Sequence, residues 1–463
     1  MSGTREGAVA EAERYFREGE FLAKLTQLVA APTQSQIPGA EPVLRGYFAE
    51  QIIPDLNDAG FTSEILDNPE KSSGPLLIAH RHEGDDLPTV LIYGHSDVVV
   101  GQDEQWRDGL SPWTLTVDGE RIYGRGTADN KGQHWINISA LRTVLSERGS
   151  LGFNAKILLE SDEEMGSRGL RAFCEREQER LASDVLIASD GPRLDPSQAT
   201  VVLGSRGLVN FEMAVNLRDG AHHSGNWGGL IKDPGIVLTH AITSLTDARG
   251  QIAVPEWRPT SLTDDVRQLL AELTVSGGPS APAIDTDWGE EDLSPEERVY
   301  GWNSFAVLAL ELGDADKPQN AIQPTARAVC QLRYVVGTQP DDVLPALRRH
   351  LDAKGFADVA VMPTPMAGMR ATRLAADDPW AQLVLKSLGQ TLGYPAALVP
   401  NIGGSIPNDI FAELLGLSTV WVPHSYAGCA QHAPNEHMLA PVAREGLQVM
   451  TGLFWDIGET KTG

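Results

Sequence analysis

The sequence predicts an α/β fold in which a mixed, mostly parallel sheet, covered by helices, is interrupted by an inserted α+β domain. The first observation is a set of short apolar runs, at residues 89–93, 155–159 and 185–188, with the length and composition of strands buried on both faces. The second is residues 131–148, which place apolar side chains at three- and four-residue spacing, as one face of a helix does. Strand, helix and strand in succession form the unit of a parallel sheet.

The third observation is a change of pattern in the middle of the chain. Residues 209–217 and 326–334 alternate with period two, which is typical of antiparallel strands with one exposed face. A polar stretch rich in Pro and Gly, residues 277–297, predicts a loop between them. Helix and parallel-strand patterns return near Asp377 and end with residues 418–422. These patterns predict an α+β segment inserted into the α/β domain.

The length of the chain also favours two domains. Its 463 residues exceed what one hydrophobic core usually supports. We therefore predict an α/β domain formed by residues 1–208 and 372–463, and an inserted α+β domain formed by residues 209–371.

Charge and composition restrict the partners and the location. Lys and Arg number 37 against 63 Asp and Glu, a formal net charge of −26, so nucleic acid and anionic membranes would meet a repelling surface. No run approaches the roughly 18 apolar residues of a membrane-spanning helix, and the charged residues 1–20 lack the apolar core of a secretory signal. We expect a cytoplasmic protein without nucleic-acid or membrane partners. Three cysteines are too few for a disulfide framework or a thiolate zinc site.

Polar side chains follow the predicted strands at their carboxyl ends, where open α/β sheets collect their chemistry. His95 and Asp97 lie two residues apart after the first strand, so that one could bind a metal ion while the other orients it. Glu163 and Glu164 belong to a row of carboxylates after the second strand, and Asp190 follows the third. A hydrogen-bonded surface pair and a solvated acidic loop remain the alternative interpretations of the first two sites.

Two further residues complete the candidate set. Asp129 follows a glycine-rich turn, which lacks the third Gly of a dinucleotide fingerprint and the Gly-Lys-Ser/Thr of a P-loop. Its alternative interpretation is a helix N-cap. His432 comes after the last predicted strand. Two histidines and three carboxylates suit a pair of divalent ions such as zinc, cobalt or manganese, with one Asp bridging them.

Five stretches carry a resemblance that covers almost the whole chain. They are GHSDV, YGRGTADNKG, ESDEEMGS, ASDG and HAPNE, in this order. In these stretches the sequence resembles the dinuclear zinc metallopeptidases and deacylases, a family that includes carnosinase, glutamate carboxypeptidase, aminoacylase, acetylornithine deacetylase and succinyl-diaminopimelate desuccinylase. Within that family the resemblance indicates the carnosinase-like dipeptidase branch.

The resemblance implies a role for each candidate ligand. Asp129 would bridge two divalent ions, with zinc expected and cobalt or manganese as alternatives. His95 and Asp190 would bind one ion, and Glu164 and His432 would bind the other.

The resemblance also implies which neighbouring residues act with the ligands. Glu163 would be the general base, and Asp97 would orient His95. The peptide bond between Asp129 and Asn130 would be cis. Many relatives carry a second Asp where this chain has Asn130.

A histidine in the inserted domain is implied to act on a second copy of the chain. Residues 221–229 resemble the HSG-x-x-GG stretch of the carnosinase branch, whose His reaches across a dimer to the active site of the partner. The resemblance therefore implies a homodimer, an inserted domain that serves as lid and dimerisation domain, and His223 as the group that stabilises the oxyanion in trans. His222 is the neighbouring alternative.

Four residues are implied to bind the substrate. Arg333 occupies the place of the arginine that holds the free carboxylate of the substrate, a task suited to the forked donors of guanidinium. Gly404 and Ser405 belong to a stretch similar to the carboxylate-binding loop of the family. Asn320 begins Asn-Ala-Ile-Gln-Pro, which departs from the Asn-x-Ile-Pro of the family by the additional Gln323.

The resemblance thus implies a metal-dependent hydrolase of a small-molecule or dipeptide substrate. It would cleave an amide bond of a dipeptide or short peptide next to a C-terminal residue with a free carboxylate, by a hydroxide held between the ions and Glu163 as general base. The alternative on the same scaffold is an N-acyl-amino-acid deacylase, of the acetylornithine deacetylase or aminoacylase type, or a hydrolase of a non-peptide amide or aryl amine. A metal-dependent dimer with a binding role is disfavoured because Glu163 and all five ligand residues are present.

Overall fold

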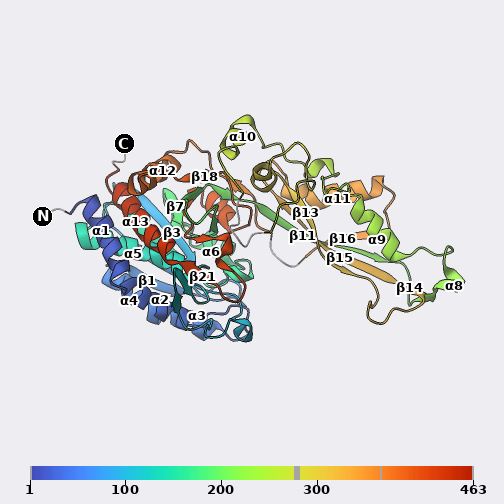
Figure 1. Cartoon of the computed structure of the whole chain (residues 1–463), viewed down its shortest axis with the longest axis horizontal. Coiled ribbons are helices and arrows are strands. Elements are labelled where there is room, and N and C mark those ends of the chain that lie inside the picture. The colour runs from blue at the N-terminus through green and yellow to red at the C-terminus, as the bar shows by residue number, and fades with distance from the viewer. Residues whose placement is uncertain (1–2, 276–281, 365–367, 461–463) are drawn as a thin grey trace.

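The computed structural model describes residues 3–275, 282–364 and 368–460. The chain forms an elongated molecule with a large α/β lobe and a smaller second lobe, and both termini lie on the large lobe (Figure 1). Within the described ranges, no helix is both long enough and apolar enough to cross a membrane. The cytoplasmic location stays a prediction.

The large lobe is built on an eight-stranded mixed sheet. In spatial order its strands are β1 (Thr62–Leu66), β2 (Leu76–Arg81), β6 (Asn154–Glu160), β3 (Thr89–His95), β7 (Val185–Ala188), β19 (Ser418–Trp421), β9 (Thr200–Val202) and β18 (Ala397–Val399). The three apolar runs of the sequence are β3, β6 and β7. β3 lies between β6 and β7 and runs parallel to both, so the carboxyl ends of the three strands meet at one edge of the sheet.

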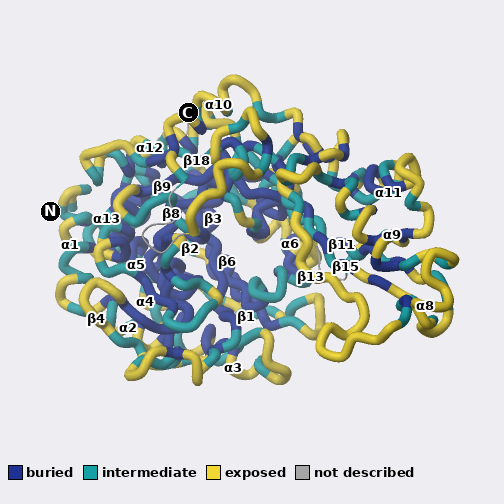
Figure 2. The backbone as a smooth tube through the Cα atoms, turned by 45° about the vertical axis from the view of Figure 1, so that its right-hand side comes forward, coloured by how far each residue is buried: buried dark blue, intermediate teal, exposed yellow. Residues whose placement is uncertain are grey.

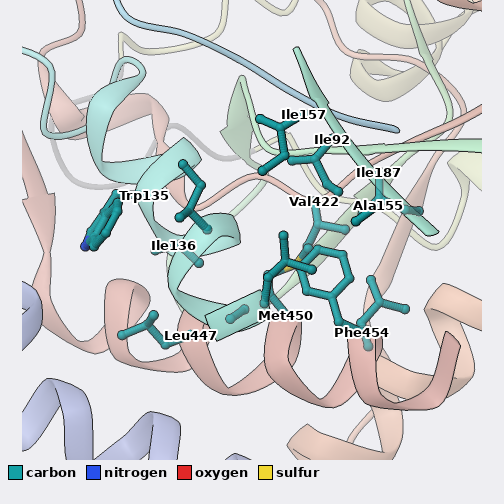
Figure 3. Close-up of a cluster of buried hydrophobic side chains, with 14 of the residues drawn as sticks. Ile92, Trp135, Ile136, Ala155, Ile157, Ile187, Val422, Leu447, Met450 and Phe454 are labelled. Atoms are coloured by element: carbon teal, nitrogen blue, oxygen red, sulfur yellow. The ribbon is translucent and has the colours of Figure 1, made fainter. Parts of the chain in front are cut away.

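Helices cover both faces of this sheet. Ile92, Ile157 and Ile187 point to one face and pack with side chains of α5 and α13 (Figure 3). Leu91 and Leu186, one position earlier on their strands, belong to the core on the opposite face with α6 and η7. The helices around the sheet are α1 (Arg5–Arg17), α2 (Glu20–Ala30), α5 (Lys131–Arg148), α6 (Leu170–Arg176), α12 (Pro379–Leu392), η7 (Ile410–Leu414) and α13 (Ala440–Ile457). A sheet covered in this way explains the continuous apolar runs of its central strands.

The prediction of a single apolar face for residues 131–148 is incomplete. The first turns of α5 are buried all round, including the polar Lys131, Gln133, His134 and Asn137. The reason is that α1, α2 and α13 contact α5 in addition to the sheet. Lys131 shows how a charge is accommodated there, because its Nζ donates hydrogen bonds to two backbone carbonyls of the α2 region at 2.9 and 2.6 Å.

A four-stranded antiparallel sheet forms the second lobe, in the order β13, β15, β11 and β16. The two period-two runs of the sequence are β11 and β15, which pair along their whole length. Alternate residues of both strands are buried against α9 and α11, as the alternation predicts. The bounds are β11 (Gly207–Asn216), α9 (Pro234–Thr243), β13 (Ser304–Glu311), β15 (Thr325–Tyr334), α11 (Val343–Ala353) and β16 (Val359–Pro363).

The loop predicted at residues 277–297 is only partly observable. Its positions 277–281 lie outside the described residues, and residues 282–294 contain neither helix nor strand. The chain then enters the π-helix η5 (Glu297–Gly301).

Short elements connect the two lobes and line the loops around them. The chain enters the second sheet through β11 and returns through β17, which pairs with β10. The domain boundaries at residues 208 and 372 lie beside this crossing and stay a prediction. Burial is concentrated in the strands and in α5, whereas the far end of the second lobe around α8 is largely exposed (Figure 2). The remaining elements are α3 (Glu41–Gly46), η1 (Tyr47–Ile52), α4 (Ile53–Asp58), η2 (Asp103–Gln105), β4 (Thr116–Asp118), β5 (Arg121–Tyr123), η3 (Glu163–Met165), α7 (Gln178–Leu181), β8 (Pro192–Arg193), β10 (Gly204–Ser205), β12 (His222–His223), α8 (Ser224–Trp227), η4 (Pro255–Trp257), α10 (Asp264–Leu270), β14 (Ala321–Ile322), η6 (Pro340–Asp342), β17 (Thr372–Arg373), β20 (Ser425–Tyr426), η8 (Ala427–Cys429) and β21 (His437–Leu439).

Candidate metal centre

Three neighbouring parallel strands bring three candidate ligands to the same edge of the large sheet. β3 ends at His95, Glu164 lies in η3 just beyond β6, and Asp190 lies two residues beyond β7. Because β3 pairs with β6 on one side and with β7 on the other, these three side chains converge although they are far apart in sequence.

Asp129 and His432 complete two groups of side chains that share Asp129. Nε2 of His95 lies 3.0 Å from Oδ1 of Asp129 and 3.6 Å from Oδ2 of Asp190. Nε2 of His432 lies 3.1 Å from Oδ2 of Asp129 and 3.0 Å from Oε2 of Glu164. In each group the candidate ligand atoms lie within 4.8 Å of one another. Imidazole nitrogens and carboxylate oxygens at such separations suit two divalent ions, so the donor set fits the metals that the sequence predicts.

Asp97 lies behind this centre and is fully buried. Nδ1 of His95 is 3.1 Å from the carbonyl oxygen of Asp97 and 3.4 Å from its Oδ1. A proton held on Nδ1 in this way leaves the lone pair of Nε2 free to bind a metal ion. The Asp97 carboxylate also accepts hydrogen bonds from the backbone N–H groups of Glu163 and Glu164, at 3.2 and 3.1 Å. Asp97 therefore ties the end of β3 to the acidic turn after β6.

A buried ion pair that the sequence analysis did not single out holds the turn before Asp129. Oε1 of Glu436 accepts hydrogen bonds from the backbone N–H groups of Gly126, Ala128 and Asp129, at 3.0, 3.1 and 3.1 Å. Its Oε2 accepts a hydrogen bond from Nη1 of Arg125 at 2.8 Å, and both side chains are 1% exposed. The only signal in the sequence was that Glu436 is the acidic residue at the end of the HAPNE stretch.

The electrostatics of the cluster favour divalent cations. Burial raises the pKa of Glu164 to about 7 and that of Asp190 to about 6, and the charge of Asp129 adds to both effects. Burial also raises the pKa of Glu163 well above its ordinary value, although His95 opposes this. Burial alone would raise the pKa of Asp129 as well, but hydrogen bonds with the two histidines hold it below its ordinary value. Carboxylates crowded in a buried site repel one another, and a cation relieves that repulsion.

The peptide bond between Asp129 and Asn130 is cis, as the resemblance implies. Nδ2 of Asn130 donates a hydrogen bond to the carbonyl oxygen of Ser189 at 2.8 Å, immediately before Asp190. The side-chain amide of Asn130 thus links the turn after Asp129 to the end of β7. An ionised Asp at this position has no proton to donate and could not form this hydrogen bond.

A second group of residues forms what we call the arginine cradle, made by Arg206, Arg333, Gly403, Gly404 and Ser405. Nη1 of Arg333 donates to Oγ of Ser405 at 3.2 Å, so two predicted substrate-binding residues meet. Nε of Arg206 donates a hydrogen bond to the carbonyl oxygen of Gly403 at 2.8 Å. The backbone N–H of Arg206 donates to the carbonyl oxygen of Gly404 at 3.1 Å. Burial and the charge of Arg333 lower the pKa of Arg206 to about 10. Two guanidinium groups this close suit an anion such as a carboxylate.

The arginine cradle adjoins the metal centre. Gly191 follows Asp190, and a Cβ added to it would lie 3.4 Å from Cδ1 of Ile402, the residue before Gly403. Pro192, two residues after Asp190, also lines the same pocket as Ile402, Gly403 and Gly404, so the loop after β7 and the loop of the cradle are neighbours.

His223 and Asn320 lie apart from both groups. β12 and β14 pair at the far end of the second lobe, where His223 is opposite Ala321 (Figure 1). The carbonyl of Asn320 accepts a hydrogen bond from the N–H of Ser224 at 2.9 Å, and His223 is exposed. Within one chain neither residue joins the metal centre or the cradle, so both roles stay predictions, and that of His223 requires a second copy.

Known proteins resemble the chain over most of its length. The sequence model of peptidase family M20/M25/M40 matches residues 91–456. The beta-Ala-His dipeptidase of Mus musculus is 27% identical over 482 residues, which cover 96% of this chain and 94% of that protein.

Solved structures share the fold. The M20 family metallo-carboxypeptidase Sso-CP2 from Sulfolobus solfataricus has a TM-score of 0.80 at 22% identity, covering 95% of this chain and 100% of that chain. The di-peptidase Dug1p from Saccharomyces cerevisiae has a TM-score of 0.80 at 20% identity, covering 100% of both chains. The predicted fold class and family resemblance are confirmed. The family match contains all five residues of the two groups that share Asp129, and the chain belongs to peptidase family M20/M25/M40.

Proposed function

We propose that the protein is a metal-dependent hydrolase that cleaves the amide bond of a dipeptide or short peptide next to a C-terminal residue with a free carboxylate. The observation that carries this proposal is the pair of side-chain groups that share Asp129, with the arginine cradle on a neighbouring loop. Similarity to a mouse dipeptidase along nearly the whole chain supports the substrate class.

The cradle would bind the C-terminal carboxylate of the substrate. Arg333 and Arg206 offer forked donors, and Ser405 and the backbone at Gly404 shape the site between them. The amide bond that precedes the carboxylate would then face the metal centre, because the loop of the cradle neighbours the loop that carries Asp190.

Each residue around the metal centre would have a separate role in the hydrolysis. Two divalent ions, zinc in our proposal with cobalt or manganese as alternatives, would activate water and polarise the scissile carbonyl. Glu163 would take a proton from the attacking water and pass it to the leaving amine. Asp97 would keep His95 oriented, and His223 of the partner subunit would stabilise the charge that develops on the carbonyl oxygen.

A hydrolysis screen joined to elemental analysis tests this function. The purified protein would be assayed with dipeptides, the same dipeptides with amidated C-termini, N-acetyl amino acids and aryl amides, and its metal content would be measured. We expect about two divalent ions per chain and the highest kcat/KM for dipeptides with a free carboxylate. Faster hydrolysis of N-acyl amino acids or aryl amides would instead support the alternative activity.

Arg333→Ala is expected to raise KM for free dipeptides by about 10- to 100-fold, because a hydrogen bond to a charged group is worth about 1.5–3 kcal/mol. KM for the amidated dipeptides should change little. Steady-state kinetics on both substrate sets checks this. Arg327→Ala is the matched control, since Arg327 lies on the same strand, is about half exposed and pairs with Glu212. An equal effect of Arg333→Ala on free and amidated substrates would remove the carboxylate-binding role.

We also propose a homodimer in which residues 209–371 serve as lid and dimerisation domain. β13 lies at the edge of the second sheet. Its side chains include Leu308 and Leu310, which are 53% and 58% exposed, and the neighbouring α9 exposes Ile236 to 61%. An open strand edge with exposed apolar side chains is suited to pairing with another chain. His223 lies away from the metal centre of its own chain, and a second copy would bring the two together.

The double variant Leu308→Glu, Leu310→Glu is expected to be monomeric, because two charges on each copy would repel and resist burial at the interface. Light scattering after size-exclusion chromatography would show half the mass of the wild-type particle. The rate of dipeptide hydrolysis should also fall, since His223 can no longer reach the active site of a partner subunit. Val117→Glu is the control, because Val117 is similarly exposed on the large lobe. A monomeric wild-type protein, or a double variant that stays dimeric, would contradict this arrangement.

A further inference from the structure

An apolar pocket of about 230 Å³ lies beside the arginine cradle, between the two lobes. Val299 and Tyr300 of η5 form the side that belongs to the second lobe. Leu194, Val399 and Ile402 form the side that belongs to the large lobe. The volume is below the roughly 300–1,000 Å³ of pockets for drug-sized ligands, so the pocket suits a single side chain.

The pocket and the cradle share a wall. Gly403 and Gly404 line the pocket with their backbone. A Cβ added to Gly403 would lie 3.0 Å from Cγ1 of Val299 and 4.0 Å from both Cε1 of Tyr300 and Nη2 of Arg206. A group bound by Arg206 is therefore next to the mouth of the pocket.

The pocket also reaches toward the metal centre. Ile402 lines it, and so does Pro192, which lies two residues after the candidate ligand Asp190. The pocket and the cradle thus lie beside the loop that carries Asp190.

The walls of the pocket offer little for a charged side chain. Arg193 is the one charged residue among those that line it. Nη1 of Arg193 donates to Glu445 at 2.6 Å, and its Nε donates to the carbonyl of Pro423 at 3.0 Å. Two nitrogens of this guanidinium are therefore paired within the protein, whereas its Nη2 is buried without a hydrogen-bond partner among the described residues. Most of the other lining side chains are aliphatic, so the surface left for a ligand is mainly apolar.

We propose that the pocket binds the side chain of the C-terminal residue and that the enzyme prefers dipeptides whose C-terminal residue is aliphatic, such as Leu, Val or Met. The inference rests on the proposed function, because it takes the cradle as the site of the substrate carboxylate. One carbon atom carries both the carboxylate and the side chain of that residue. A carboxylate held by Arg206 and Arg333 consequently directs the side chain to the neighbouring pocket.

A series of dipeptides that differ only at the C-terminus tests this preference. For the metal-loaded protein, kcat/KM would be measured with Ala-Gly, Ala-Ala, Ala-Leu, Ala-Glu and Ala-Lys. We expect Ala-Leu to exceed Ala-Gly by about 10- to 100-fold, the range for burying an aliphatic side chain. Equal values across the series, or a preference for Ala-Glu or Ala-Lys, would overturn the proposal.

Substitutions of Val299 assign the preference to this pocket. Val299→Phe fills the space, so kcat/KM for Ala-Leu should fall by about 10-fold or more while that for Ala-Gly changes by less than about 3-fold. Val299→Thr keeps the shape but adds a hydroxyl, and a smaller loss in the same direction is expected. Val117→Phe, on the surface of the large lobe, should change neither value. Equal losses for both substrates in Val299→Phe, with Val299→Thr unchanged, would refute the pocket.

The pocket can be tested separately from the proposed reaction. If no dipeptide is cleaved, the proposed function fails, and thermal unfolding with free leucine or glycine then measures binding directly. A larger rise in Tm with leucine than with glycine, lost in Val299→Phe, would support the pocket. Equal rises would overturn it.

Discussion

Replacing Glu163 by Gln is expected to lower kcat for dipeptide hydrolysis by about 10²- to 10⁴-fold, the usual contribution of a general base. The amide has nearly the shape of the carboxylate but cannot take a proton from the attacking water. The metal content should stay at the wild-type value, because Glu163 belongs to neither of the two candidate ligand groups among the described residues. Steady-state assays and elemental analysis of the same preparation would check both parts.

The contrast between Glu163 and its neighbour makes this prediction specific. Oε2 of Glu164 lies 3.0 Å from Nε2 of His432, so Glu164→Gln should lose a metal ion together with activity. The backbone N–H groups of both glutamates are bound by Asp97, and this support is unchanged in either variant. Metal loss from Glu163→Gln, or wild-type turnover with full metal content, would show that the two roles are wrongly assigned.

The strand-end residues of the candidate centre could be predicted because functional residues of open α/β sheets gather at the carboxyl ends of the strands, and the strands themselves are visible as apolar runs. His95 ends a strand and Glu164 and Asp190 each follow one, and parallel pairing of β3 with β6 and β7 is enough to bring them together. The alternation in β15 similarly predicts which face is buried and which carries Arg333. Local periodicity contains this information, so no tertiary contact is needed to read it.

Residues whose role depends on a distant contact could not be found in this way. Arg206 lies immediately before β11. Its role is indicated by its hydrogen bond to Gly403, which is 197 positions further along the chain. Glu436 similarly acquires its role through Arg125, 311 positions away. The burial of α5 on all sides was missed for the same reason, since it depends on three other helices.

The residue expected to act in trans is a third case. His223 lies at the far end of the second lobe, next to the substrate-binding candidate Asn320 but away from the metal centre (Figure 1). A motif can indicate that such a histidine takes part in catalysis. In the homodimer that we propose, a second copy covers the exposed edge of β13 and supplies the active site on which this histidine acts.

Replacing Asp129 by Asn is expected to weaken the binding of both metal ions by more than about 100-fold. Residues that merely support a ligand typically change metal affinity by about 10- to 100-fold, and Asp129 is a candidate ligand of both ions. One oxygen faces His95 and the other faces His432, so no other single substitution should affect both groups equally. Zinc titration of chelator-treated protein, with Tm followed as a function of zinc, measures the loss.

His432→Ala is the informative comparison, because it removes a candidate ligand from one group and should cost one ion only. Asp85→Asn is the neutral control, since the side chain of Asp85 is 96% exposed. A general collapse of the turn would not explain the result for Asp129→Asn: the backbone N–H of residue 129 is held by Glu436, and that hydrogen bond does not involve the substituted side chain. Loss of a single ion from Asp129→Asn would mean that the two groups bind their metal ions independently. The proposal that Asp129 is a ligand of both ions would then be wrong.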